Sequence, residues 1–209
     1  RSLENSGALG ESANRITTLT NNGTLTNTES GTIYSTTLNN ADTLANEGTV
    51  NTTTLANTGT ISGAGDLTVV NGGSSSGDGS ITQANITLTG GTFANSADME
   101  ATTALVNGAA ITNTAAIETA LLTNTGTIEG TGDLTVTGGG TSSGAITQAN
   151  IDIAGAFANS AAMEATTSLA NADTLTNTST ITAQTLANTG TIEGAGNLTV
   201  TNGGSSSRS

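Results

Sequence analysis

The sequence contains no histidine, cysteine, tryptophan or proline. Histidine is the commonest general acid or base, and a serine or threonine nucleophile needs an adjacent base. Imidazole and thiolate groups are also the usual ligands of zinc and iron. These absences predict that the chain is not an enzyme and has no catalytic residues, no metal site and no cofactor.

Basic side chains are equally scarce. Arg1, Arg15 and Arg208 are the only ones, against 16 acidic residues, and the net charge is −13. Binding of a nucleic acid or an anionic membrane depends on clustered lysine and arginine. No run of about 18 apolar residues is present to span a bilayer. We therefore expect no nucleic acid partner and no membrane insertion.

Only three residues are aromatic, namely Tyr34, Phe93 and Phe157. An ordinary domain of this length buries many more. Hydrophobic residues nevertheless make up 33% of the chain and are regularly spaced, which favours an ordered protein over a disordered one. We expect a narrow core of Leu, Ile, Val and Ala. Arg-Ser at both ends, with no signal peptide, suggests a segment cut from a longer protein.

A long repeat dominates what is present. TGTIEGTGDLTV at 125–136 returns as TGTIEGAGNLTV at 189–200, an offset of 64, and TGTISGAGDLTV at 58–69 precedes it by 67. The length differs in a Gly/Ser loop, where a turn absorbs it. We therefore describe residues 1–209 as a single β-solenoid fragment with these repeat units: 11–62 (partial), 63–129, 130–193 and 194–207 (partial).

A shorter period lies inside each unit. Large apolar residues follow one another at spacings of six, with an occasional five, as at Phe157, Met163, Leu169, Leu175, Ile181, Leu186 and Ile192. A helix would need spacings of three and four, whereas single inward residues flanked by Thr and Ser suit short strands. The pattern predicts an all-β, single-stranded parallel β-helix with about three short strands per coil of roughly 20 residues.

The length of the repeat unit indicates how many residues one coil contains. Sixty-four residues divide into three coils of about 21, which would return every unit to the same face. The alternative is a left-handed hexapeptide helix with 18 residues per coil, but 64 is not a multiple of 18. We therefore expect a right-handed solenoid. With about 4.8 Å per coil, roughly ten coils would form a rod about 50 Å long.

Asparagine recurs two residues after the apolar position, at Asn46, Asn57, Asn95, Asn107, Asn113, Asn124, Asn159, Asn171, Asn177 and Asn188. Asparagine tolerates the left-handed conformation of a sharp corner, and stacked amides can form a ladder along the axis. Glycine often follows two residues later, at Gly48, Gly59, Gly126 and Gly190. We expect both residue types to build the corners.

Three short motifs carry a family resemblance: LANTGTI at 55–61 and 186–192, LTNTGTI at 122–128 and GAGDLTV at 63–69. They resemble the haemagglutinin-type repeats of filamentous haemagglutinins and related large secreted adhesins of Gram-negative bacteria. The resemblance implies a right-handed β-helix that forms a stalk at the bacterial cell surface or outside the cell. It implies no catalytic residues. The unit of about 64 residues and the low charge depart from that pattern.

Acidic residues provide the only candidates for chemistry. Asp66 and Asp133, with Asn197 at the matching place, follow glycine-rich turns, so they are interpreted as turn caps, with a calcium site as the alternative. Glu100 and Glu164 recur as well. Three coils apart they would lie about 14 Å from each other, too far for the carboxylate pair of a glycosidase. We interpret them as solvated surface residues.

The remaining candidates have structural interpretations. Phe93 and Phe157 share the apolar period and are assigned to the core, and Tyr34 stands alone. The sequons at Asn22, Asn51, Asn85, Asn177 and Asn197 are expected by chance in a chain so rich in Asn and Thr. An ice-binding face would need a Thr pair on every coil, whereas Thr135 and Thr137 would recur only once in three coils.

Two functional hypotheses result. The first is a structural stalk segment of a surface or secreted adhesin, which presents or spaces a binding region for cell-surface ligands. The alternative is a subunit of an extracellular filament in a biofilm or matrix, whose partner is another copy stacked head to tail. An ice-binding or glycan-active β-helix ranks behind both.

Overall fold

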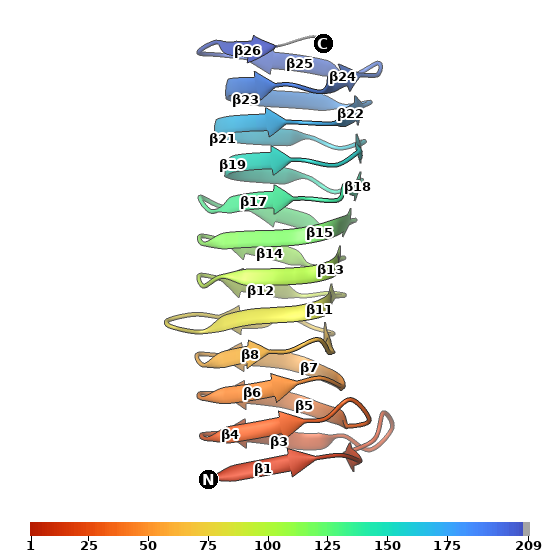
Figure 1. The fold of residues 1–209 in the computed structure, drawn as a ribbon, viewed down its shortest axis with the longest axis vertical. Helices are drawn as coiled ribbons and strands as arrows, with labels where there is room; N and C mark the ends of the chain where they lie inside the picture. Colours follow the sequence, from red (N-terminus) through yellow and green to blue (C-terminus); the bar gives the residue numbers. More distant parts are fainter. Residues whose placement is uncertain (207–209) are drawn as a thin grey trace.

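A computed structural model describes residues 1–206, so position 207 of the last repeat unit and Arg208–Ser209 lie outside the described residues. The described chain is a parallel β-solenoid of about 11 turns of about 18 residues, with no helix (Figure 1). The nearer strands point to the right as the chain rises from the N-terminus to the C-terminus, so the solenoid is right-handed, as expected. The prediction of an all-β parallel solenoid is confirmed.

The strands of the first half of the rod are β1 (Ser2–Asn5), β2 (Ala8–Leu9), β3 (Ile16–Asn21), β4 (Thr24–Asn27), β5 (Thr32–Asn40), β6 (Thr43–Asn46), β7 (Thr49–Asn57), β8 (Thr60–Ser62), β9 (Asp66–Val69), β10 (Gly73–Ser75), β11 (Ser80–Leu88), β12 (Thr92–Asn95) and β13 (Met99–Asn107). Those of the second half are β14 (Ala110–Asn113), β15 (Ala116–Asn124), β16 (Thr127–Glu129), β17 (Asp133–Val136), β18 (Gly140–Ser142), β19 (Ile146–Ile153), β20 (Phe157–Asn159), β21 (Met163–Asn171), β22 (Thr174–Asn177), β23 (Thr180–Asn188), β24 (Thr191–Glu193), β25 (Asn197–Val200) and β26 (Gly204–Ser206).

Each coil has three faces, and each face places one residue of the six-residue period in the core. Many coils join two faces in one long strand. In β13, for example, Met99 and Leu105 belong to different faces, and the register with β15 shifts between Ala101 and Ala104, where the strand turns the corner. The six-residue period is thus the distance from one face to the next.

Strand register stacks the inward residues into three columns, numbered in the order in which the chain visits them. Column 1 consists of Leu3, Leu25, Leu44, Ile61, Ile81, Met99, Ile117, Leu134, Ile151, Leu169, Leu186 and Gly204. Column 2 consists of Leu9, Ile33, Val50, Leu67, Ile86, Leu105, Leu122, Gly140, Phe157, Leu175 and Ile192. Column 3 consists of Leu19, Leu38, Leu55, Gly73, Phe93, Ile111, Ile128, Ile146, Met163, Ile181 and Leu198.

The strand register corrects the predicted number of residues per coil and the prediction that every repeat unit returns to the same face. A coil takes about 18 residues, not about 20. Leu67, Leu134 and Leu198 are equivalent in the repeat, yet they lie in columns 2, 1 and 3. Each unit therefore adds three coils and two further faces, so equivalent residues move round the rod. The argument that rejected 18 residues failed because it required every unit to return to the same face.

Phenylalanine fills the core where glycine leaves a gap. Gly73 and Gly140 occupy column positions that carry large apolar side chains in most other coils, and a Cβ on either would meet a backbone oxygen of the preceding coil at 2.1 or 2.0 Å. Phe93 stacks directly on Gly73, and Phe157 on Gly140. Both rings are buried, which confirms their assignment to the core. Large and small residues thus alternate to keep packing dense.

The asparagines form a second inward column on each face. Their side chains are buried, and most of them donate from Nδ2 to a side-chain oxygen of the next coil, for example Asn21 to Asn40 at 2.7 Å and Asn40 to Asn57 at 2.8 Å. Nδ2 also donates to backbone oxygens at the corner, as from Asn40 to Asp42 at 2.9 Å. The predicted ladders are therefore present, and they satisfy polar groups that burial would otherwise leave unpaired.

Where a glycine interrupts an asparagine ladder, a glutamine of the following coil continues it. Gly130 separates Asn113 from Gln148 in column order, and the longer glutamine side chain reaches past it, so that Asn113 Nδ2 donates to Gln148 Oε1 at 2.7 Å. Gln83 reaches past Gly63 to Asn46 in the same way. The recurring ITQANI motif thus has a structural purpose that its spacing alone did not show.

The predicted conformation of the corners is wrong. Within residues 1–206 no residue other than glycine has a positive φ, so the asparagines are not left-handed. Gly59 and Gly126 also lack a positive φ. They are needed because stacked corners approach closely: a Cβ would lie 2.1 Å from Asp42 O and 2.0 Å from Ala109 O respectively. The constraint comes from the neighbouring coil, not from the turn itself.

Replacing a ladder residue should weaken the rod far more than replacing its outward neighbour. Asn40→Ala removes three donated hydrogen bonds and leaves Asn57 Oδ1 without its donor. Because an unsatisfied buried polar group costs about 1–3 kcal/mol, we expect a loss of about 2 kcal/mol or more in the free energy of unfolding. Urea denaturation measures it. Asn39→Ala is the matched control, and equal losses in the two variants would contradict a stabilising role for the ladder.

Candidate functional site

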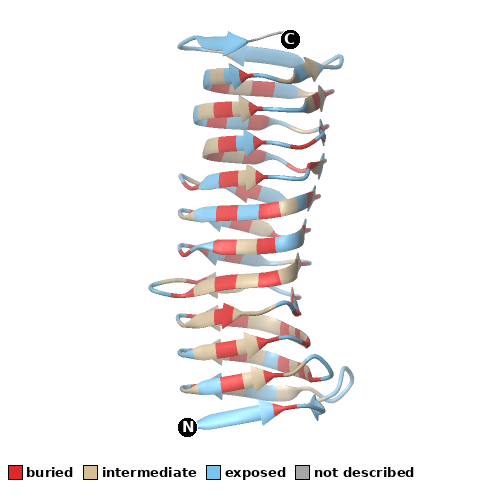
Figure 2. Ribbon diagram, in the orientation of Figure 1, coloured by how far each residue is buried: buried red, intermediate tan, exposed pale blue. Residues whose placement is uncertain are grey.

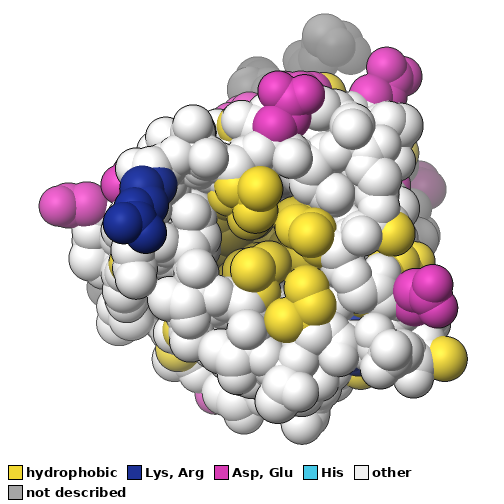
Figure 3. Space-filling model, turned by 90° about the horizontal axis from the view of Figure 1, so that it is seen from below, with side chains coloured by type: hydrophobic (Ala, Val, Ile, Leu, Met, Phe, Trp, Pro, Cys, Tyr) yellow, Lys and Arg dark blue, Asp and Glu magenta, His cyan; other side chains and the backbone are white. Residues whose placement is uncertain are grey.

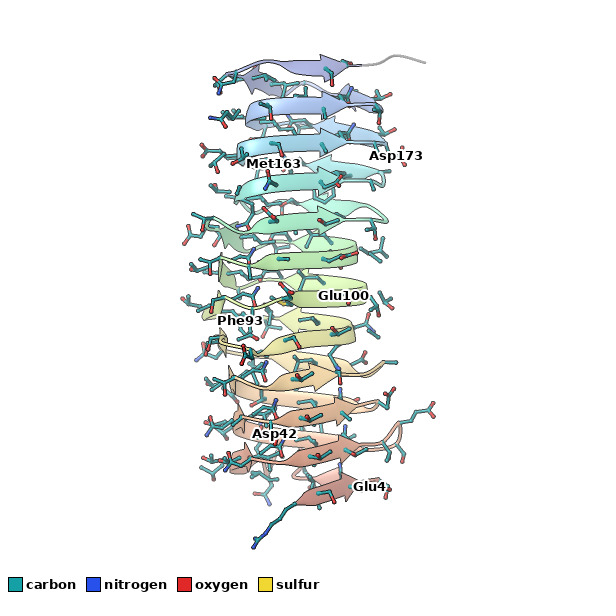
Figure 4. All side chains as sticks on the ribbon, turned by 60° about the vertical axis from the view of Figure 1, so that its left-hand side comes forward. Glu4, Asp42, Phe93, Glu100, Met163 and Asp173 are labelled. Carbon is teal, nitrogen blue, oxygen red and sulfur yellow. The ribbon has the colours of Figure 1, made fainter. Side chains whose placement is uncertain are left out.

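A group of carboxylates lies on the outer surface beside column 1. Asp98 precedes and Glu100 follows the buried Met99, and Glu118 of β15 is paired in register with Glu100. Because paired parallel strands lie about 4.8 Å apart, Glu100 and Glu118 stack one above the other on this wall. Figure 4 labels Glu100 there. The three acids line a hollow of about 310 Å³ together with Ser80, Thr82, Met99 and Ala116.

The geometry of this acidic hollow is that of an exposed anionic surface. Glycosidases also use two carboxylates, about 5 to 9 Å apart, but one of them is kept protonated by an apolar environment. Asp98 and Glu118 are exposed. Among residues 1–206, no group of three or more His, Cys, Asp or Glu side chains is placed to hold a metal ion. The hollow thus brings acidic side chains together without the apolar environment of a catalytic acid or a metal-binding group. The absence of enzyme activity stays a prediction.

Sequence reasoning missed this pairing because it compared equivalent residues of different units. Glu100 and Glu164 follow Met99 in column 1 and Met163 in column 3, so they lie on different faces, not one above the other. Glu118 has no acidic counterpart one unit later: the matching position is Thr182. The signal that would have found the pair is the register of about 18 residues between Glu100 and Glu118.

The interpretation of Asp66 and Asp133 as turn caps is wrong. Both side chains point outward, and each carboxylate accepts a hydrogen bond from an asparagine of the next coil, Asn85 to Asp66 and Asn150 to Asp133, both at 2.7 Å. Asn197 begins β25 at the corresponding position on another face. The two aspartates therefore tie neighbouring coils together on the outside of the rod.

The equivalent threonines of the repeat lie on three different faces, and one of the sequons is buried. Thr135 lies between Glu118 and Asp152 in its outer column, so carboxylates interrupt any threonine array there. Its equivalents, Thr68 and Thr199, lie on the other two faces. Asn177 is buried in a ladder and donates to Ser179 O at 2.9 Å, so this sequon is not an accessible acceptor in the folded chain.

Arg15 forms a clamp that sequence reasoning did not foresee. Its guanidinium donates to Ser35 O and Asn51 O, both at 3.0 Å, and to Asn51 Oδ1 at 2.7 Å. It also lies 5.6 Å from the ring centroid of Tyr34, within the range of a cation–π contact. The lone tyrosine and one of the few arginines thus hold the loop before β3 against two coils. No spacing rule in the sequence joins these residues.

Comparison with known proteins does not identify a family for this chain. No family model, no curated protein and no solved structure matches the chain. The described residues also contain no helix that is long and apolar enough to cross a membrane.

Removing one charge of the stacked pair should stabilise the rod slightly. Like charges on directly opposed strand positions repel, so we expect Glu118→Gln to raise the free energy of unfolding by a few tenths of a kcal/mol. The gain should shrink at high salt, because salt screens exposed charges. Urea denaturation at low and high ionic strength measures both. Glu29→Gln, in an exposed turn, changes the net charge equally, and the same gain there would show that stacking is irrelevant.

Proposed function

We propose that the chain is a structural stalk segment of a bacterial cell-surface or secreted adhesin, which spaces or presents a binding region. The observation that carries this proposal is the unbroken core. Buried apolar residues follow one another coil by coil in a single core cluster, without a domain boundary (Figure 2). A spacer needs this property, since its purpose is to hold two points at a set distance.

The backbone supports the proposal because its hydrogen bonds run along the rod axis. Every strand from β5 to β23 pairs with strands of the coil below and the coil above. About 11 turns at about 4.8 Å each correspond to a rod roughly 50 Å long. A longer rod therefore needs only further repeat units, each joined to the preceding one by the same parallel strand pairing.

The surface also suits an extracellular spacer. It is rich in Thr, Ser, Asn and Gly, and the excess of acids over arginines repels nucleic acids and anionic membranes. The short motifs LANTGTI and GAGDLTV resemble the repeats of secreted adhesins, which supports that location. We therefore propose that the protein lies outside the cell or on the bacterial surface, where the partners of the whole protein would be cell-surface ligands.

Labelling of intact cells tests the proposal. An antibody raised against the purified rod, applied to unpermeabilised cells of the producing bacterium, should give immunogold particles on or beyond the outer surface. Permeabilisation should add little signal. Labelling that appears only after permeabilisation would overturn the extracellular assignment and with it the adhesin stalk.

A second candidate function is a subunit of a self-assembling extracellular filament. The parallel pairing of every coil with the next favours it, because a second copy could continue the same backbone hydrogen bonding along the axis. Figure 3 shows hydrophobic side chains at the centre of the N-terminal end, ringed by polar residues. Such ends could stack on a second copy, head to tail.

Electron microscopy of the purified chain separates the two candidates. The stalk predicts isolated rods about 50 Å long, whereas the filament predicts long, uniform fibres. Leu3→Arg places a charge in the exposed stack, so it should abolish fibres and leave isolated rods unchanged. Fibres that persist in Leu3→Arg would show that assembly uses another surface.

A further inference from the structure

Three buried side-chain oxygens of residues 1–206 have no hydrogen-bond partner: Oδ1 of Asn95, Asn159 and Asn171. Each belongs to the first asparagine of a ladder, so no asparagine of the coil below donates to it. A buried acceptor without a donor is costly, and native proteins commonly satisfy it with an ordered water.

Two of these oxygens lie directly above a serine. Ser75 is paired with Asn95, and Ser142 with Asn159. Both serines end the Gly-x-Ser strands β10 and β18, which we call serine rungs. The same arrangement therefore occurs independently in columns 3 and 2, once in each of two repeat units.

Hydrogen bonding explains why the ladder stops at a serine rung. Asn124 Nδ2 donates to Ser142 Oγ at 3.0 Å, which continues the ladder from below. The serine hydroxyl donates its only proton to Gly144 O at 2.7 Å. Nothing is left to donate to Asn159 Oδ1. At the other rung, Asn57 donates to Ser75 at 3.1 Å, and Ser75 points its hydroxyl towards Gly79 O.

Space for a small donor exists at the same place. Serine is shorter than the asparagine found at this position in the next coil. Ser142 and Asn159 also line a hollow of about 290 Å³ that opens to the surface, together with the hydroxyl-bearing residues Thr141, Ser143, Ser160, Thr176 and Thr178. The hollow brings solvent to the outer side of this rung, whereas Asn159 Oδ1 itself is buried.

We propose that each serine rung holds one ordered water molecule, which joins the ladder below to the ladder above. The water donates one hydrogen bond to Asn159 Oδ1, or to Asn95 Oδ1 at the other rung. It donates the second to the serine Oγ, which has a free lone pair. Two polar partners at one point meet the requirement for a buried water. Asn171 lies above the apolar Ile153, has no such second partner and is not included.

A high-resolution crystal structure of the chain and of Ser142→Asn tests the proposal. In the unmodified chain we expect a water within hydrogen-bonding distance of both Asn159 Oδ1 and Ser142 Oγ. In Ser142→Asn the new Nδ2 should donate directly to Asn159 Oδ1, and the water should be gone. A serine that donates directly to Asn159 without a water, or density with the coordination of a cation, would overturn the proposal.

Nuclear magnetic resonance of the unmodified chain decides the question in solution, even if Ser142→Asn fails to fold. The side-chain amides of Asn95 and Asn159 should show cross-relaxation with a long-lived water. Asn107 is the internal control: it also begins a ladder, but its Oδ1 already accepts from Ala109 N at 3.0 Å. Equal water contacts at all three amides, or none at Asn95 and Asn159, would refute a site specific to the serine rungs.

Discussion

The structure depends on one constraint: every inward side chain must fit between two copies of the same backbone path, one strand spacing above and one below. Apolar columns meet it with one Leu, Ile, Val, Met or Phe per face in most coils. The asparagine ladders meet it by hydrogen bonding along the axis, because an amide both donates and accepts. Glycine appears where stacked corners touch, and phenylalanine follows where a glycine has left volume, as at Gly140 and Phe157.

The same constraint determines on which face of the coil each repeat unit places its residues. Since a unit covers three coils and two faces, each surface feature that it carries reappears on a different side of the rod. Thr68, Thr135 and Thr199 are the clearest case. The repeat therefore does not stack its equivalent threonines on one face. For a stalk this distribution is suitable, because the rod is held together by its interior.

The acidic hollow and the serine rungs arise from opposite causes. Glu100 and Glu118 meet because neighbouring coils bring together residues that are not equivalent in the repeat. Ser75 and Ser142 recur because they are equivalent, and each interrupts a ladder in the same way. Features of the first kind differ from coil to coil, whereas those of the second kind belong to the architecture itself.

The sequence by itself determined the fold class, the narrow aromatic-poor core, the asparagine ladders and the burial of Phe93 and Phe157. These follow from a local period of six, which any solenoid register preserves. Tertiary structure alone decided the coil length, the face on which each unit places its residues, the pairing of Glu100 with Glu118, and the Arg15 clamp on Tyr34 and Asn51. The physical reason is that contacts between coils depend on the summed length of three faces and their corners, and small variations in the corners change that sum without altering the six-residue pattern.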